Sequence, residues 1–166
     1  MPAVSAEPVL PASGNGWVQC RCGHKHWGRY GAAGLFLVRR GPDGNFADVV
    51  LQHRAPWSHN GDTWAVPGGA LDLGETAFAG ATRESAEEAG IDPCAVCELA
   101  EFVLDHGDWS YTTIVAEYLA PTTPIAITDA ESLAIEWVAL AEIHVRNLLP
   151  AFASSLPSLL GALKNF

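Results

Sequence analysis

The sequence predicts an α/β domain with a mixed sheet, and three observations carry this prediction. Short apolar runs bounded by turn residues alternate with two stretches of helical spacing. The 166 residues are 49% hydrophobic and 17% charged, which allows a real core and excludes general disorder. Neither an internal repeat nor a change of composition divides the chain. We therefore expect one domain over residues 1–166, with residues 1–30 forming an N-terminal arm and a β-hairpin.

The expected strands are apolar runs of strand length separated by Gly, Pro, Asp and Asn. The turn sequence GPDGN separates the first two runs, and a polar, aromatic loop over residues 54–69 surrounds the third. These runs are Gly31–Val38, Asp48–His53, Trp64–Val66, Leu99–Leu104, Tyr111–Leu119 and Ile135–Leu140.

Two segments are expected to be helical. Thr76 is a suitable N-cap for a helix that ends near Ala89, with Gly90 as the residue after its last turn. A second, amphipathic helix begins at Pro150, and Pro157 predicts a kink or a second start within it. The apolar residues at helical spacing in this tail are Phe152, Leu156, Leu159, Leu160 and Leu163.

The charge of the chain narrows its function. With a net charge of −10 and nine Lys and Arg residues, the chain lacks the basic stripe that polynucleotide binding requires. A small anionic substrate stays compatible, because a metal ion neutralises it locally. The chain has no apolar run of about 20 residues and no recognisable secretory signal, so we expect a cytoplasmic protein that does not bind membranes. Its four cysteines are expected to be free thiols.

The predicted helix over residues 76–89 carries an unusual acidic face. Glu84, Glu87 and Glu88 lie at positions i, i+3 and i+4, so their carboxylates project together and repel one another. Two of them also fall in the last turn, where the helix dipole disfavours anions, and Arg83 is the nearest compensating cation. The spacing fits either a solvated acidic face or a set of oxygen ligands for Mg²⁺.

The residues around this face resemble the Nudix box, G-x5-E-x7-R-E-U-x-E-E-x-G-U, where U is apolar. Every fixed position of the pattern is matched, and Trp64–Gly69 before it is also similar to the family. One apolar position departs, because Ser85 stands there, which affects a packing contact rather than the chemistry. The matching residues are Gly69, Glu75, Arg83, Glu84, Glu87, Glu88, Gly90 and Ile91.

The resemblance implies an α/β/α sandwich with a mixed sheet that hydrolyses a nucleoside diphosphate linked to another moiety. It also implies a Mg²⁺ or Mn²⁺ cofactor and a small-molecule nucleotide as the partner. By the same match, Arg83 holds a Glu carboxylate in place, and Glu75 orients the loop and the helix. The implied metal ligands are Glu84, Glu87, Glu88 and the carbonyl of Gly68.

The sequence offers three candidates for the general base. Glu131 precedes the last predicted strand, where some members of the family carry this residue. A box glutamate is the second source. The third is a cluster at a predicted strand end, made of Asp105, His106 and Asp108.

Substrate contacts are expected from the loop after the second strand. Trp57 and His59 are candidates to stack on a base, and Arg54 is a candidate for a phosphate. Trp109 and Tyr111 are alternative stacking surfaces, whereas Trp64 is expected in the core. The sequence does not separate oxidised nucleoside triphosphates, ADP-ribose and dinucleoside polyphosphates as substrates, and a homodimer is neither indicated nor excluded.

Two classes of function therefore remain. The first is a metal-dependent Nudix pyrophosphohydrolase, which the intact acidic positions favour. The second is a Nudix-fold module that binds or senses a nucleotide without turnover, because one fold hosts several functions.

The segment CRCGHKHWG contains candidate zinc ligands, namely Cys20, Cys22, His24 and His26. A continuous strand would spread alternate residues too widely for one tetrahedral site, so zinc binding requires a sharp turn at Gly23. Without it, a simple β-hairpin is favoured. Two further readings involve the CAVC sequence at residues 94–97: completion of a four-thiolate site if the fold brings it near, or redox chemistry, which lacks a βαβ context there.

Overall fold

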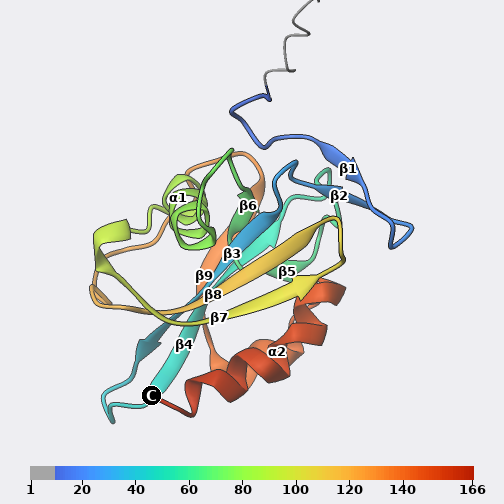
Figure 1. The fold of residues 1–166 in the computed structure, drawn as a ribbon. Coiled ribbons are helices and arrows are strands. Elements are labelled where there is room, and N and C mark those ends of the chain that lie inside the picture. The colour runs from blue at the N-terminus through green and yellow to red at the C-terminus, as the bar shows by residue number, and fades with distance from the viewer. Residues whose placement is uncertain (1–9) are drawn as a thin grey trace, which may run out of the picture.

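A seven-stranded mixed sheet forms the centre of the computed structural model, which describes residues 10–166 (Figure 1). Five strands follow in the order β5-β4-β3-β8-β7, while β6 pairs with β3 and β9 with β4. Strands β3 and β8 are parallel, and the other pairs are antiparallel. The strands are β3 (Ala32–Arg40), β4 (Phe46–Arg54), β5 (Trp64–Ala65), β6 (Gly68–Ala70), β7 (Val96–Asp105), β8 (Ser110–Tyr118) and β9 (Ser132–Ala139).

Two helices cover opposite faces of this sheet, α1 (Ala77–Ala89) and α2 (Pro150–Leu163) (Figure 1). The buried apolar residues accordingly form two clusters, one under each helix. Ala81 and Ala89 of α1 pack on Leu35 of β3, whereas Phe152 and Leu159 of α2 pack in the other cluster. Burying an apolar helix face on each side gives three layers, so the predicted α/β/α sandwich with a mixed sheet is confirmed.

Helix α1 has the predicted ends. The Thr76 hydroxyl accepts a hydrogen bond from the backbone N–H of Ala79 at 3.2 Å, and Gly90 adopts φ 66° in the left-handed region. Ser85, the departure from the Nudix pattern, is fully buried. Its Oγ donates to the Ala81 carbonyl at 2.7 Å, so a polar side chain is tolerated at an apolar position.

Helix α2 begins at Pro150 as predicted but continues as one helix across Pro157. The second start therefore does not occur. Pro157 lies on the exposed side of the helix, so the Ala153 carbonyl, which lacks its usual donor, is also on the solvent side. The buried side keeps its apolar contacts through Phe152, Leu156, Leu159 and Leu163.

Several short elements complete the chain. A separate hairpin pairs β1 (Trp17–Gln19) with β2 (Lys25–Trp27). Two 3₁₀ helices, η1 (Pro93–Ala95) and η2 (Leu140–Val145), were not expected from the sequence. Strand β6 was not expected either, because glycine has a low strand propensity. The part of the expected N-terminal arm before residue 10 lies outside the described residues. Among residues 10–166, no helix is both long and apolar enough to cross a bilayer.

Candidate active site

A cavity of about 880 Å³ lies beside the acidic face of α1, a volume typical of sites for small ligands. Its floor is formed by strands β3, β5, β6 and β8, and the β1–β2 hairpin contributes part of the wall. Of the predicted site residues, those lining the cavity are Arg54, His59, Gly68, Arg83, Glu84, Glu87, Glu88 and Glu131.

Arg83 binds two acidic side chains from different elements. Its Nε and Nη2 donate to the two Glu75 oxygens at 2.8 and 2.9 Å, and its Nη1 donates to Glu84 at 2.7 Å. Nη2 also donates to the Ala70 carbonyl of β6 at 3.0 Å. The adjacent Arg83 guanidinium lowers the pKa of Glu75. Glu75 additionally accepts the N–H of Asp72, so Glu75 and Arg83 join the loop, strand β6 and helix α1.

Glu84 lies directly over the backbone of Gly69. A Cβ atom at residue 69 would come within 2.5 Å of the Glu84 carboxylate. A side chain at residue 69 would therefore displace the Glu84 carboxylate, which gives a physical reason for glycine at the first position of the box motif. Burial raises the pKa of Glu84, although Arg83 opposes this effect.

Glu88 is the most buried of the three carboxylates, with 6% of its surface exposed. The Gly68 N–H donates to its Oε2 at 3.0 Å. Burial, followed by the charge of Glu84, raises the pKa of Glu88 to about 8. A carboxyl group held in this way is costly to ionise unless a cation joins it. Glu87, by contrast, has 61% of its side chain exposed and lies 3.6 Å from Arg83.

The carbonyl of Gly68 points away from the neighbouring strand. Leu35 donates to Pro67 and Leu71 donates to Gly31, which fixes the phase of the β3–β6 ladder. Gly68 faces Gly34 in the intervening pair, which shares no ladder hydrogen bonds. Both polar backbone groups of Gly68 are therefore directed toward the side from which Glu88 receives its hydrogen bond.

Glu131 reaches the cavity because its loop is fastened to the end of α1. Thr128 donates to the carbonyls of Glu87, through its hydroxyl, and of Glu88, through its N–H. The Glu131 carbonyl accepts the Ala55 N–H at 2.8 Å. Carboxylate oxygens of Glu88, Asp129 and Glu131 consequently lie within 4.8 Å of one another.

Asp129 also lines the cavity, although it was not among the residues predicted from the sequence. Its Oδ1 accepts from the Glu131 N–H at 3.2 Å and from the Ser132 hydroxyl at 3.0 Å, and buried Gln52 donates to Ser132 at 2.8 Å. Its position in the sequence could have indicated this, because Asp129 lies two residues before Glu131, in the loop where a general base was predicted.

The third predicted source of the general base, the cluster of Asp105, His106 and Asp108 at the end of β7, is largely engaged with other groups. Asp105 accepts the Gly107 N–H at 2.7 Å within the turn, and Asp108 pairs with Arg21 of the hairpin at 2.7 Å. Only His106 of this cluster lines the cavity.

The aromatic wall differs from the expected one. Trp57 does not line the cavity and is 73% exposed, because it lies on the outer side of the turn that Ser58 closes by donating to Ala55. The alternative candidates Trp109 and Tyr111 do line it, and buried Trp64 packs in the core as expected. Trp17 and Trp27 also line the cavity and were missed, since they flank a hairpin distant in sequence from the box.

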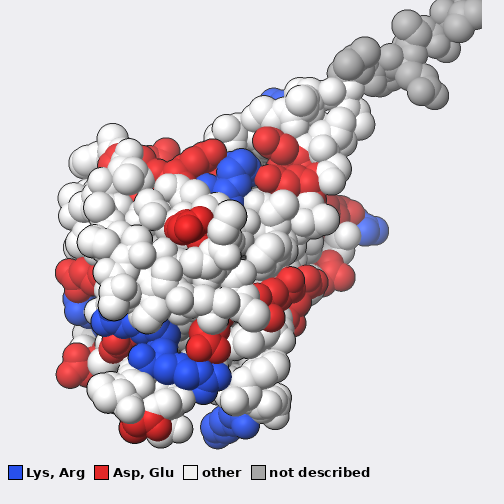
Figure 2. All heavy atoms as spheres, turned by 90° about the vertical axis from the view of Figure 1, so that its left-hand side faces the viewer, with Lys and Arg blue, Asp and Glu red and all other residues white. Residues whose placement is uncertain are grey.

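The donor set of the cavity fits a divalent cation. The side chains of Glu84, Glu87, Glu88, Asp129 and Glu131 all line it, and Arg83 is already committed to Glu75 and Glu84. Hard carboxylate and carbonyl oxygens are the ligands that Mg²⁺ and Mn²⁺ prefer. On the face turned toward the viewer in Figure 2, acidic side chains gather around basic ones at the upper end. The carboxylates that line the cavity are able to bind a metal ion.

Fold and site together define the class of protein: an α/β/α sandwich with an aromatic cavity and an oxygen-donor cleft able to hold a divalent cation. The sequence matches the NUDIX domain over residues 29–159, and the chain belongs to this family. The predicted class of enzyme, a Nudix pyrophosphohydrolase, is thereby confirmed.

Known relatives support this assignment. The chain is 45% identical to a putative 8-oxo-dGTP diphosphatase 3 of Mycobacterium tuberculosis over 93% of its own length and 71% of that protein. It is 46% identical to a nucleoside triphosphate pyrophosphatase/Nudix hydrolase fusion protein of Bifidobacterium longum, covering 87% of this chain. Only 30% of the length of the fusion protein is spanned by this match.

Solved structures agree with the fold. A Nudix hydrolase from M. smegmatis, RenU, superposes with a TM-score of 0.83 at 38% identity, over 92% of this chain and 97% of that one. An Ap4A hydrolase from C. elegans gives a TM-score of 0.65 at 23% identity, over 81% and 99% of the two chains. The second likeness concerns the fold alone.

Proposed function

We propose that this chain hydrolyses a pyrophosphate linkage in a nucleotide, with Mg²⁺ or Mn²⁺ held by Glu84, Glu87, Glu88 and the Gly68 carbonyl. The observation that carries the proposal is the row of box carboxylates, ordered by Arg83 at an aromatic cavity. A bound divalent ion would neutralise pyrophosphate charge and lower the pKa of water.

The protein groups have separate tasks in this proposal. Glu75 and Arg83 set the position of Glu84, so the ligand geometry exists before the substrate arrives. Arg54 at the cavity wall meets a phosphate oxygen, because a guanidinium matches phosphate geometry. His59, from the same loop, contributes to the substrate wall.

Glu131 is the proposed general base. Its carboxylate lies close to Glu88, yet it comes from a loop outside the box helix. It is exposed, so its carboxylate is accessible to a water molecule that it orients and deprotonates. A box glutamate is the main alternative, since Asp105 and Asp108 are engaged elsewhere and His106, although it lines the cavity, contacts His26 of the hairpin.

Glu131→Gln tests this role. Single-turnover kinetics at saturating Mg²⁺ should show a rate lowered by about 100-fold, within the usual range for a general base. Metal affinity should change little, and the acid limb of the pH–rate profile should shift or disappear. Asp105→Asn is the matched control and should keep the wild-type rate. A wild-type rate in Glu131→Gln would assign the base to the box helix.

The proposed substrate class is a purine nucleoside triphosphate, including forms with an oxidised base. Two considerations support it: the M. tuberculosis relative is named for 8-oxo-dGTP, and the cavity offers Trp17, Trp27 and Trp109 as surfaces for an aromatic base. A panel of dGTP, 8-oxo-dGTP, ADP-ribose and Ap4A, assayed with Mg²⁺ for released phosphate, pyrophosphate and nucleotide products, tests the class. We expect the highest kcat/KM for a triphosphate. Preference for ADP-ribose or Ap4A would refute this class while preserving the hydrolase proposal.

The same panel also tests the alternative that the sequence left open, a module that binds a nucleotide without turnover. Tight nucleotide binding, without products over a range of Mg²⁺ and Mn²⁺ concentrations, would favour the sensor.

A further inference from the structure

The β1–β2 hairpin contains the sharp turn that a metal site in this segment requires. Gly23 adopts φ 90°, a left-handed conformation in which a side chain would be strained. The Cys20 N–H donates to the His24 carbonyl at 3.0 Å, and the Gly23 N–H donates back to Cys20 at 3.1 Å. Because β2 then runs back along β1, alternate residues come together rather than spreading along one strand.

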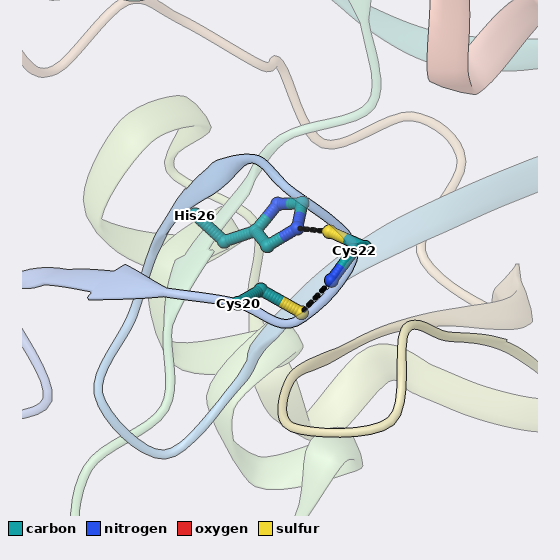
Figure 3. A group of neighbouring side chains, drawn as sticks. All are labelled: Cys20, Cys22 and His26. Carbon is teal, nitrogen blue, oxygen red and sulfur yellow. Dashed lines mark hydrogen bonds between the residues drawn. The ribbon is translucent and has the colours of Figure 1, made fainter.

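Three potential ligands meet inside this turn, as Figure 3 shows. The Cys22 Sγ lies 3.1 Å from the His26 Nε2, and the Cys22 N–H donates to the Cys20 Sγ at 3.5 Å. Ligand atoms of Cys20, Cys22 and His26 all lie within 4.8 Å of one another. His24 is absent from this cluster.

The surroundings hold the imidazole and the first thiol in place. His26 stacks on Trp109 with ring centroids 4.1 Å apart and planes at 8°. His106, in the turn between β7 and β8, has its ring centroid 4.7 Å from that of His26. The buried Cys20 thiol donates to the His106 carbonyl at 3.4 Å. These contacts converge from two segments about 80 residues apart.

From this cluster we infer a zinc site formed by Cys20, Cys22 and His26; the His106 imidazole lies next to His26 but outside the 4.8 Å cluster, and would supply the fourth ligand by turning its ring toward the ion. Two thiolates with imidazole nitrogens are a common ligand set for tetrahedral Zn²⁺. The same sulfur donors disfavour Mg²⁺, which prefers oxygen ligands. The site is therefore chemically distinct from the carboxylate cleft.

The site would fasten the hairpin to the wall of the nucleotide cavity. Besides the Cys20–His106 hydrogen bond and the His26–Trp109 stacking, that attachment includes two hydrogen bonds, from the Arg21 N–H to Asp108 at 3.0 Å and from Trp109 Nε1 to the Gly28 carbonyl at 3.1 Å. It also includes the Arg21–Asp108 ion pair, in which the Arg21 side chain is 79% exposed. An exposed pair of this kind is weak. Zinc bonds to both segments would fix His26 and Trp109, which line the cavity.

The other cysteine pair cannot complete this site. Cys97 lies near the start of β7, whereas His106, which contacts Cys20, directly follows the end of that strand. A strand rises about 3.3 Å per residue, so these positions are separated by roughly 30 Å. Cys94 lies in η1, before β7, and is three residues further from His106 in the chain than Cys97 is.

Metal analysis of the full chain tests the inference. The reduced protein is incubated with Zn²⁺ in excess Mg²⁺, which competes for the carboxylates, and is desalted before zinc and free thiols are counted. We expect one tightly held zinc per chain. Co²⁺ substitution should give thiolate-to-metal charge-transfer bands and the d–d absorption of a tetrahedral site.

Variants assign the ligands. Cys22→Ser, at an exposed position, should abolish zinc retention and the charge-transfer bands without affecting folding. The double change Cys94→Ser and Cys97→Ser is the matched control and should retain both. His106→Ala should weaken zinc binding while leaving the charge-transfer bands. Absence of zinc in the reduced wild type, retention of zinc in Cys22→Ser, or a Cys20–Cys22 disulfide in the protein as purified would each overturn the inference.

Discussion

The carboxylate cleft and the cysteine–histidine hairpin meet at one cavity, which Glu88 and His26 both line, but they are assembled differently. The cleft draws Gly68, Glu88 and Glu131 from a strand, a helix and a distant loop. The hairpin cluster takes its first three residues from a single seven-residue segment. The cleft therefore depends on the whole fold, whereas the hairpin depends mainly on one turn.

The two regions also differ in the chemistry of their ligand atoms. Like-charged oxygens in the cleft are held together by Arg83 and by burial, at a cost in electrostatic repulsion. In the hairpin, by contrast, burial and then the neighbouring histidines lower the pKa of His26, which favours its neutral imidazole. The oxygen donors of the cleft suit a hard cation, whereas the sulfur and nitrogen donors of the hairpin suit zinc. Variants in one region should leave the other intact.

The largest expected effect separates the two regions through Glu87. Glu87→Gln conserves shape and removes one repulsive charge from an exposed position, so folding should be unharmed. Hydrolysis should fall by at least about 100-fold, because metal-mediated charge stabilisation is worth several kcal/mol. Steady-state kinetics measure the loss and metal analysis measures hairpin zinc, which should be unchanged. Glu142→Gln, on η2, is the control. Full activity in Glu87→Gln at saturating Mg²⁺ would remove Glu87 from the ligand set.

Gly69→Ala should disturb the cleft through geometry alone. The added Cβ would come within 2.5 Å of the Glu84 carboxylate and push it away from Arg83. Loss of such a supporting contact typically lowers activity or metal affinity by about 10- to 100-fold. Gly161→Ala is the matched control, because nothing lies within 4 Å of its added Cβ. Mg²⁺ titration of activity provides the measurement, and an unchanged Mg²⁺ dependence in Gly69→Ala would contradict the steric argument.

The pH dependence of stability should identify the buried carboxyl group. In the metal-free protein, the pKa of Glu88 is about 8 when folded and near its ordinary 4.5 when unfolded. The folded state therefore binds more protons between these values, so its stability is greatest at the lower pH and is lost as pH rises toward 8. The slope from this group is at most about 1.4 kcal/mol per pH unit.

Urea unfolding in EDTA between pH 6 and 8 measures this slope. Glu88→Gln should flatten it, since the substituted side chain does not titrate. Addition of Mg²⁺ to the wild type should raise stability most at the upper end of the range, because the ion binds the charged carboxylates. Equal slopes in wild type and Glu88→Gln would show that another group titrates.

The smallest expected effect concerns Trp57. Because this side chain lies outside the cavity, Trp57→Ala should change KM by less than about twofold, as expected for an exposed position. Trp109→Ala should raise KM by roughly tenfold, since stacking on a base is worth about 1–3 kcal/mol. Steady-state kinetics on the best substrate compare the two variants. A larger effect from Trp57 would mean that its loop folds over the bound nucleotide.

The sequence determined the ends of α1 and the spacing of the box residues, because these follow from short-range rules, whereas the α/β/α sandwich was implied by the resemblance to the Nudix family. Thr76 and Gly90 cap the helix through bonds within one turn. The spacing of Glu84, Glu87 and Glu88 places them on one face by helix geometry alone.

The tertiary structure decided everything that depends on where loops return. Asp129 and Glu131 join Glu88 because Thr128 is bonded to the last carbonyls of α1, a contact about 40 residues apart in the chain. Trp27 lines the cavity while Trp57 does not, although both are tryptophans in polar surroundings. His106 meets His26 because the hairpin folds back onto the β7–β8 turn. Local spacing specifies which side chains share a helix face, but pairings between distant segments are chosen by the packing of the whole sheet.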